Sequence, residues 1–231
     1  MAAGCSHDTD GKASPSSTSS STSATTSSAD DEDSGTTSDE LAEGLLPDDA
    51  FGPDTQVETL DSSDLADSST GLPTGGTVTP AECATGFGSV QPDTSDLESV
   101  AGESATTASS VVVEVLGEDD SINAQGDEDF DAFLAQCPQL TVSAPDGTSA
   151  TIDLQGLDVP DLGDVSLGLT MTVTAAGPDG TSITLPLLIG VAIQDHRLVL
   201  LTEVALDPAT PLDQAGFVSL FGKAFDAQKD I

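Results

Sequence analysis

Apolar and polar residues alternate along two long segments in the C-terminal half of the chain, residues 167–175 and 183–193. A period of two is that of a β-strand with one buried face and one wet face. We therefore predict two long strands. Asp195 and His196 then separate the second strand from the apolar residues 197–201, a spacing that predicts a tight hairpin.

Other segments carry weaker strand and turn signals. The pentapeptide Pro-Asp-Gly-Thr-Ser occurs at 145–149 and again at 178–182, and Pro-Asp-Gly is favourable turn chemistry, so each copy predicts a hairpin tip. Residues 111–116 and 55–60 predict further strands. Pro186 cannot donate a hydrogen bond to a sheet, which predicts a sheet edge or a bulge at that end of its strand.

Four segments carry helix signals. Thr79-Pro80-Ala81-Glu82 and Thr210-Pro211-Leu212-Asp213 each combine a capping hydroxyl, a proline at the first helical position and an acid three residues on, which predicts helices from Thr79 to Phe87 and from Thr210 onward. Residues 127–136 have acids in the first turn and three inward apolar residues before Cys137-Pro138, and 39–46 predicts a shorter helix. The last helix carries an apolar stripe made of Phe217, Phe221, Ala224 and Phe225.

These elements together predict an α+β fold. We expect an antiparallel sheet of about five to seven strands, covered by three or four helices and stapled by one disulfide. We assign residues 39–231 to this single domain.

The N-terminal part has a different composition. Residues 13–38 are almost entirely Ser, Thr, Ala and Asp, and they cannot bury enough surface to offset chain entropy. We therefore predict a disordered tether over residues 6–38.

The first five residues, Met-Ala-Ala-Gly-Cys, resemble a lipobox, the end of a bacterial lipoprotein signal peptide. Residues 1–5 are thus interpreted as a signal remnant, with Cys5 carrying the lipid. A basic and an apolar region should precede a lipobox, so this interpretation expects either that the true start lies upstream of Met1 or that the chain has been trimmed. The alternative is an ordinary cytosolic N-terminus with a chance cysteine.

The cysteine count fits the lipid anchor. If Cys5 is acylated, Cys83 and Cys137 remain as an even pair for an oxidising compartment. Their spacing closes a loop of about 55 residues, which the chain-entropy model values at roughly 4 kcal/mol. The alternative is two buried free thiols.

The charge balance excludes one class of partner. The chain has 41 Asp and Glu against 4 Lys and Arg, a formal net charge of −37, and nucleic-acid binding needs clustered basic residues. So much like charge opposes compaction, so we expect the melting temperature to rise between low salt and about 0.5 M salt. A flat or falling melting curve would contradict this. A soluble acidic protein of a halophile would share this composition.

Few residues suggest catalysis. His7 lies in the predicted tether, and His196 in a two-residue turn is more often a polar turn residue than a base. Asp119, Ser121, Asn123 and Asp127 match positions 1, 3, 5 and 9 of a calcium loop, but Ala124 and Phe130 break the motif, so a solvated acidic loop is favoured. Paired acids could hydrolyse glycosides, but so many acids guarantee close pairs. We predict no catalytic residue, no metal site and no cofactor.

The order of motifs resembles a known family. After Leu45-Leu46-Pro47 come a Thr-Pro-x-Glu-Cys motif at Thr79–Cys83 and a Phe-x-x-Phe-x-x-x-Cys-Pro motif at Phe130–Pro138, then hairpins and a terminal helix. This order is similar to that of actinobacterial surface lipoproteins of unassigned function, whose domain resembles the PknH-like extracellular sensor domain. The resemblance implies a single α+β domain, a disulfide between two helical segments and a cleft for a ligand, and it implies no catalytic residue.

The resulting prediction is a non-enzymatic, lipid-anchored protein on the outer face of the cytoplasmic membrane. Its sensor-like domain would bind a small-molecule or envelope ligand, with no nucleic acid partner. One alternative is a secreted acidic hydrolase that uses a carboxylate pair. Another is a soluble acidic interaction protein of a halophile.

Overall fold

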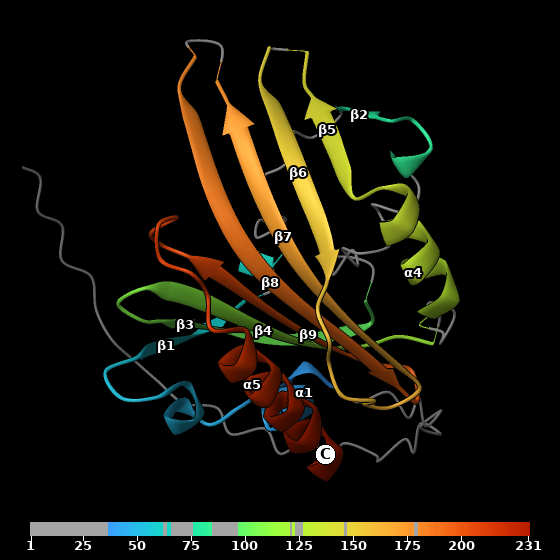
Figure 1. Ribbon diagram of the computed structural model, residues 1–231. Coiled ribbons are helices and arrows are strands. Elements are labelled where there is room, and N and C mark those ends of the chain that lie inside the picture. Colours follow the sequence, from blue (N-terminus) through green and yellow to red (C-terminus); the bar gives the residue numbers. More distant parts are fainter. Residues whose placement is uncertain are drawn as a thin grey trace, which may run out of the picture. The chain divides into compact units, whose positions relative to one another are not determined.

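The computed structural model describes residues 37–61, 64–65, 76–84, 97–120, 122, 127–145, 147–177 and 180–231, which form a twisted sheet with helices packed on it (Figure 1). The predicted lipobox and most of the predicted tether lie outside these residues. Within the described part of the chain, no helix has both the length and the apolar character needed to cross a bilayer.

Nine strands make up the sheet in the described residues, in the order β1-β3-β4-β9-β8-β7-β6-β5-β2. Every neighbouring pair is antiparallel. The strands are β1 Gln56–Leu60, β2 Thr77–Thr79, β3 Ser99–Thr106, β4 Ser110–Glu118, β5 Gln139–Ser143, β6 Ser149–Gly156, β7 Val165–Ala176, β8 Ser182–Gln194 and β9 Arg197–Ala205.

Three α-helices have described bounds: α1 Ser38–Ala42, α4 Asp127–Gln136 and α5 Gln214–Ala227. Two 3-10 turns, η1 Asp48–Phe51 and η3 Gln228–Asp230, follow α1 and α5. Helix α4 packs against β6 and β7, α5 packs against β8 and β9, and α1 packs against β3 and β4 (Figure 1).

The predicted fold class is therefore wrong. The described residues form mostly one sheet of nine strands with three helices, where we expected five to seven strands. The main omission is β3, whose sequence Ser-Val-Ala-Gly-Glu-Ser-Ala-Thr has only one large apolar residue. Such a strand shows no clear alternation by itself, because its pairing with β1 and β4 is what makes it a strand.

The two faces of the sheet bury separate apolar clusters. Alternate residues of β5, β6, β7 and β8 join Cys83, Phe133 and Cys137 in one cluster, under α4. The opposite face of β3, β4, β8 and β9 joins Leu41, Leu46, Phe217 and Phe221 in a second cluster, under α1 and α5. Strand β8 serves both, since Leu187 and Ile189 belong to the first and Leu188 to the second.

The predicted hairpins are confirmed. Residues 195–196 join β8 to β9, both with positive φ as a two-residue turn requires. The two Pro-Asp-Gly-Thr-Ser copies join β5 to β6 and β7 to β8, with Gly147 at φ 87° and Gly180 at φ 82°. Both glycines adopt the left-handed conformation that turns favour.

Two element boundaries were wrongly predicted. Thr79 ends β2 instead of capping a helix, and the last helix begins at Gln214, where the side chain of Asp213 accepts the Gly216 N–H. Residues 85–87 of the predicted helix lie outside the described residues. The predicted stripe of Phe217, Phe221, Ala224 and Phe225 is nevertheless buried.

Strand β8 is flanked by β7 and β9, but Pro186 lies beyond the end of the pairing with β9, so this end of β8 is a local sheet edge, as predicted. Pro186 pairs with Thr172 of β7, whereas the pairing with β9 begins one residue later, at Leu187. The proline therefore sits where the ladder to β9 has ended, so that its missing N–H removes no hydrogen bond there.

Candidate functional site

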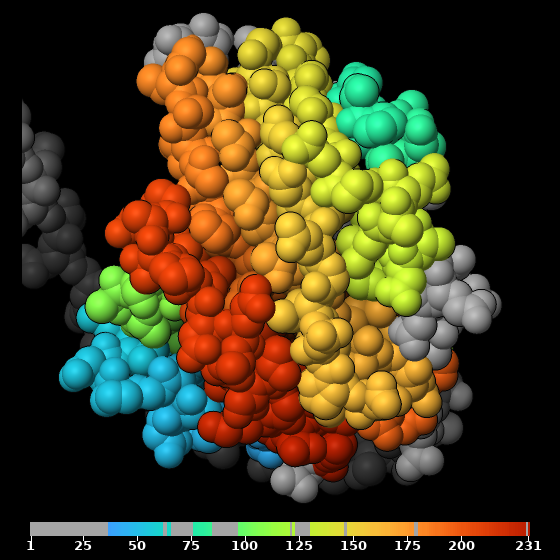
Figure 2. All heavy atoms as spheres, in the orientation of Figure 1, coloured from blue at the N-terminus to red at the C-terminus, as the bar shows by residue number. Residues whose placement is uncertain are grey.

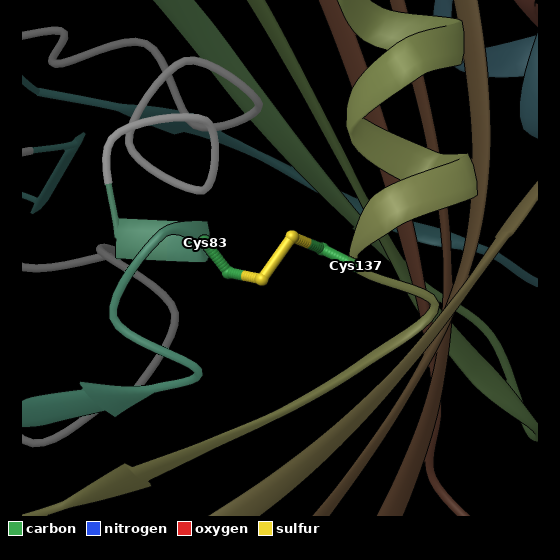
Figure 3. The surroundings of a disulfide bond; sticks show 2 residues. All are labelled: Cys83 and Cys137. Carbon is green, nitrogen blue, oxygen red and sulfur yellow. A yellow bond between two sulfur atoms is a disulfide. The ribbon is translucent and has the colours of Figure 1, made fainter.

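The structure contains a disulfide between Cys83 and Cys137 (Figure 3). Cys83 lies in the helical turn after β2, and Cys137 follows the last residue of α4. Their Cα atoms are 5.9 Å apart, and both residues are buried in the cluster under α4. The bond therefore ties the short edge strand β2 and its following turn to the end of α4.

Other predicted site residues lie partly or wholly outside the described residues. Cys5 and His7 are among them, as are Ser121 and Asn123 of the calcium-loop match. Asp119 is described and buried, and its N–H donates to the backbone oxygen of His196. Within the described residues there is no group of three or more His, Cys, Asp or Glu placed to hold a metal ion.

His196 occupies the predicted hairpin turn. It is exposed, its φ is 69°, and its Nδ1 lies 3.0 Å from the backbone oxygen of Ile122. The ring therefore joins the β8–β9 turn to the segment after β4. These contacts are those of a polar turn residue.

Two glutamates form the most unusual polar group in the described residues. Glu103 of β3 and Glu114 of β4 lie directly opposite each other in the strand register, so their side chains leave the same face of the sheet with Cβ atoms about 4.5–5.5 Å apart. Only 6% of Glu103 and 0% of Glu114 is exposed. Acidic residues this deeply buried are rare unless they are paired.

Hydrogen bonding to this pair is sparse. The Leu46 N–H donates to Glu114 Oε2 at 3.2 Å. Glu103 Oε1 and Glu114 Oε1 are buried and have no donor among the described residues. Two ionised carboxylates would leave these oxygens unsatisfied, whereas a proton on one carboxyl supplies a donor to the other.

Burial raises the pKa of both groups. Desolvation is the main cause for each, and it raises the pKa of Glu114 to about 8 and that of Glu103 to about 7. A hydrogen bond between the two side chains further raises the pKa of Glu114 and lowers that of Glu103. Both carboxyl groups therefore hold a proton more readily than an exposed glutamate does.

A third acid on the same face is Glu203 of β9, which is opposite Val112 of β4. Burial raises its pKa, a hydrogen bond from Ser110 lowers it, and the charge of Asp213 raises it. This end of the sheet thus buries acidic groups among apolar ones.

The pair does not have the access that glycoside hydrolysis requires. The substrate must reach both carboxyl groups, one as acid and the other as base or nucleophile. Glu114 is fully covered by the residues packed on this face, which include Leu46. The carboxyl pair therefore gives no support to the alternative of a secreted hydrolase.

This pair was not predicted from the sequence, although one of its members, Glu114, stands at a position that signals a buried acid. In Val-Val-Val-Glu-Val-Leu of β4, Glu114 interrupts a continuous apolar run, which is typical of a strand buried on both faces. An acid at such a position must be buried with a partner. The identity of that partner could not be read from the chain, because it depends on the register between β3 and β4.

No family model and no curated protein matches the chain. Solved structures similar to it include an uncharacterised Rv0999 ortholog from Mycobacterium smegmatis, with 21% identity, a TM-score of 0.57, and coverage of 81% of this chain and 95% of that one. They also include the extracellular domain of PknH from Mycobacterium tuberculosis, with 13% identity, a TM-score of 0.49, and coverage of 85% and 98%.

The likeness to the uncharacterised mycobacterial protein confirms, at the level of the fold, the resemblance drawn from the motifs. At these identities the likeness extends to the fold alone. The lipoprotein part of that resemblance stays a prediction.

Proposed function

We propose that this chain is a lipid-anchored extracytoplasmic protein whose folded domain binds a ligand or an envelope partner without catalysing a reaction. The observation that carries the proposal is the Cys83–Cys137 disulfide. Disulfides form and persist in oxidising compartments and are rare in the cytosol. A paired Cys83 and Cys137 leaves Cys5, in the Ala-Ala-Gly-Cys sequence, as the single remaining thiol for a lipid.

Two further features support the non-catalytic part of the proposal. The side chains of Glu103 and Glu114 are buried, and the ring of His196, in the β8–β9 turn, contacts the backbone oxygen of Ile122. The fold is shared with a mycobacterial protein that is itself uncharacterised, so the likeness supports the architecture and leaves the ligand open.

The first test concerns the anchor. The chain is expressed in an actinobacterial host behind a lipoprotein leader, and the membrane and aqueous fractions are separated with detergent. We expect the wild-type protein in the detergent phase. Mass spectrometry of its N-terminal peptide should show the added mass of a diacylglyceryl group on Cys5. Such an anchor supplies two or more acyl chains and holds firmly.

Two variants serve as test and control. Cys5→Ser should move the protein to the aqueous fraction, while Ser6→Ala should leave it in the detergent phase. A wild-type chain that is unacylated and free in the cytosol would contradict the proposal and favour the soluble acidic protein of a halophile.

The second test counts thiols. The purified chain is alkylated under denaturant without reductant and then analysed by mass spectrometry. We expect no label on Cys83 or Cys137. Full labelling of both residues in protein isolated from its native compartment would remove the main support for export.

A further inference from the structure

We propose that Glu103 and Glu114 form a proton-operated latch for the N-terminal arm, which we define as residues 37–52. While the pair holds a shared proton, the arm stays docked on β3 and β4, and when that proton is lost the arm is released. The inference goes beyond the proposed function and does not depend on the lipid anchor.

The arm covers the pair directly. Helix α1 packs against β3 and β4, and Leu41 and Leu46 are buried in the cluster on this face. The Leu46 N–H donates to Glu114 Oε2, so one carboxyl of the pair holds the arm backbone itself. Figure 2 shows the first described residues, in blue, beside the red C-terminal segment.

The other contacts of the arm are apolar packing and two contacts near α1; Leu45, Ala50 and Phe51 pack against the cluster on this face. The Val100 N–H donates to Ser38 Oγ at 3.3 Å, and Gly44 lies so close to Ile231 that an added Cβ would be 2.7 Å from its Cδ1. Helix α1 has only five residues, which is too short to be stable without its contacts to the sheet. The arm is therefore held by the packing of its apolar side chains on this face and by the hydrogen bond between Leu46 and Glu114.

The groups around the pair are mostly acidic. Asp48 of η1 raises the pKa of Glu103, and Glu203 of β9 lies on the same face with Asp213 close to it. Helix α1 adds three exposed acids on the covering element. These are Asp39, Glu40 and Glu43.

The basic residues on the packed elements are already engaged or exposed. Arg197 of β9 bonds to Glu118 at 3.5 Å and to the backbone oxygen of Gln228 at 2.9 Å. On α5 and the turn after it, Lys223 is exposed and Lys229 bonds to Asp226. Neither ion pair of the described residues involves Glu103 or Glu114, so a proton is what neutralises the pair.

Loss of that proton creates a specific problem for the folded state. Two carboxylates would then face each other under an apolar cover, and neither has a second donor to compensate for desolvation. The change that restores hydration with the least loss of packing is removal of the short arm, because the sheet ladder beneath it stays intact. The arm begins at the C-terminal end of the predicted tether, so its release would lengthen that predicted tether.

The experiment measures amide hydrogen exchange on the purified full chain between pH 6 and pH 9, with rates corrected to protection factors. We expect protection over α1 and at Leu46 to fall about tenfold for each pH unit in which one proton is released. The amides of β6 and β7, under the other cluster, should keep their protection. Constant protection of the arm over this range would overturn the proposal.

The decisive variant is Glu103→Gln/Glu114→Gln. Glutamine donates and accepts hydrogen bonds at nearly the same shape, so it imitates the protonated pair but cannot ionise. We expect arm protection in this variant to be independent of pH. Glu58→Gln is the matched control, because Glu58 is exposed on β1 and pairs with Ser104, and it should keep the wild-type response.

A result in which the double variant keeps the full pH response would assign the effect to another group and reject the latch. If the double variant does not fold, carbon-13 NMR titration of the glutamate carboxyls in the wild-type protein tests the latch instead. Two carboxyls with titration midpoints far above the ordinary glutamate range support the latch. Midpoints within that range for all glutamates reject it.

Discussion

The two faces of the sheet achieve burial by different means. The face under α4 is apolar, and the Cys83–Cys137 bond ties its outermost strand to the end of its helix. The face under α1 and α5 has no disulfide among the described residues and buries Glu103 and Glu114 beside its apolar cluster. One face thus carries a covalent bond, whereas the other buries two carboxyl groups whose pKa is raised by burial.

The difference shows how a very acidic chain can still fold around a sheet. Acids that stay in water cost little, but an acid in the core must find a proton or a partner. The structure confines its most buried pair to the face whose cover is the shortest helix, α1. The face under α4 is therefore expected to stay intact when the other face responds to pH.

The largest expected effect tests the covalent face. Replacing both cysteines, Cys83→Ala/Cys137→Ala, should lower the free energy of unfolding by about 4 kcal/mol, because the bond closes a long loop in the unfolded chain. Urea denaturation monitored by circular dichroism measures this loss. Cys5→Ala is the control and should leave the stability unchanged. A loss below about 1 kcal/mol would mean that α4 holds β2 by packing alone.

The second prediction concerns the protonated face. Both glutamates have a folded-state pKa above the ordinary value of 4.5, so the folded chain binds more protons than the unfolded chain between about pH 4.5 and pH 8. Stability from the pair is therefore complete below that range and is lost as the pH rises through it. The slope approaches about 1.4 kcal/mol per pH unit for each proton released.

Urea denaturation at a series of pH values measures this slope. The variant Glu103→Gln/Glu114→Gln should flatten it and should be more stable than the wild type at pH 9. A rise in the wild-type free energy of unfolding between pH 5 and pH 8 would mean that the pair does not dominate the pH dependence of stability. The two faces would then not differ in the way described above.

The third prediction compares two glycines that pair with each other across β7 and β8. A Cβ at Gly168 would meet the backbone oxygen of Leu157, whereas a Cβ at Gly190 would lie 2.9 Å from the ring of Phe221. A ring can turn and a backbone cannot, so Gly168→Ala should cost about 3 kcal/mol and Gly190→Ala about 1–2 kcal/mol.

Thermal melting of the two variants measures these costs. Gly222→Ala on α5 is the control, since nothing lies within 4 Å of its added Cβ, and alanine should stabilise the helix by up to about 1 kcal/mol. A larger loss for Gly190→Ala than for Gly168→Ala would show that α5 is packed more rigidly than the segment at Leu157.

The smallest predicted effect concerns the start of α5. Asp213→Ala removes the side chain that accepts the Gly216 N–H at 3.1 Å and should cost about 1 kcal/mol. Asp226→Ala removes the exposed partner of Lys229 and should change stability by less than about 0.5 kcal/mol. Equal losses of stability in the two variants, measured by thermal melting, would show that Asp213 does not stabilise α5 as a cap.

Sequence analysis predicted the elements whose signal is local. The long strands β7 and β8, the β8–β9 hairpin and α4 were predicted because period, turn residues and helix charges act over a few residues. The two cysteines could also be named as a pair, because counting requires no geometry. The start of α5 was missed, since two residues three positions apart, Thr210 and Asp213, both carry side chains that can cap a helix.

What the sequence determined by itself was therefore the set of strong local elements, the acidic character and the candidate cysteine pair. Only the tertiary structure decided the nine-strand order and the meeting of Glu103 with Glu114. The physical reason is that a strand as polar as β3 is stabilised by its neighbours, so its partners and the burial of its acid depend on a register that joins distant parts of the chain.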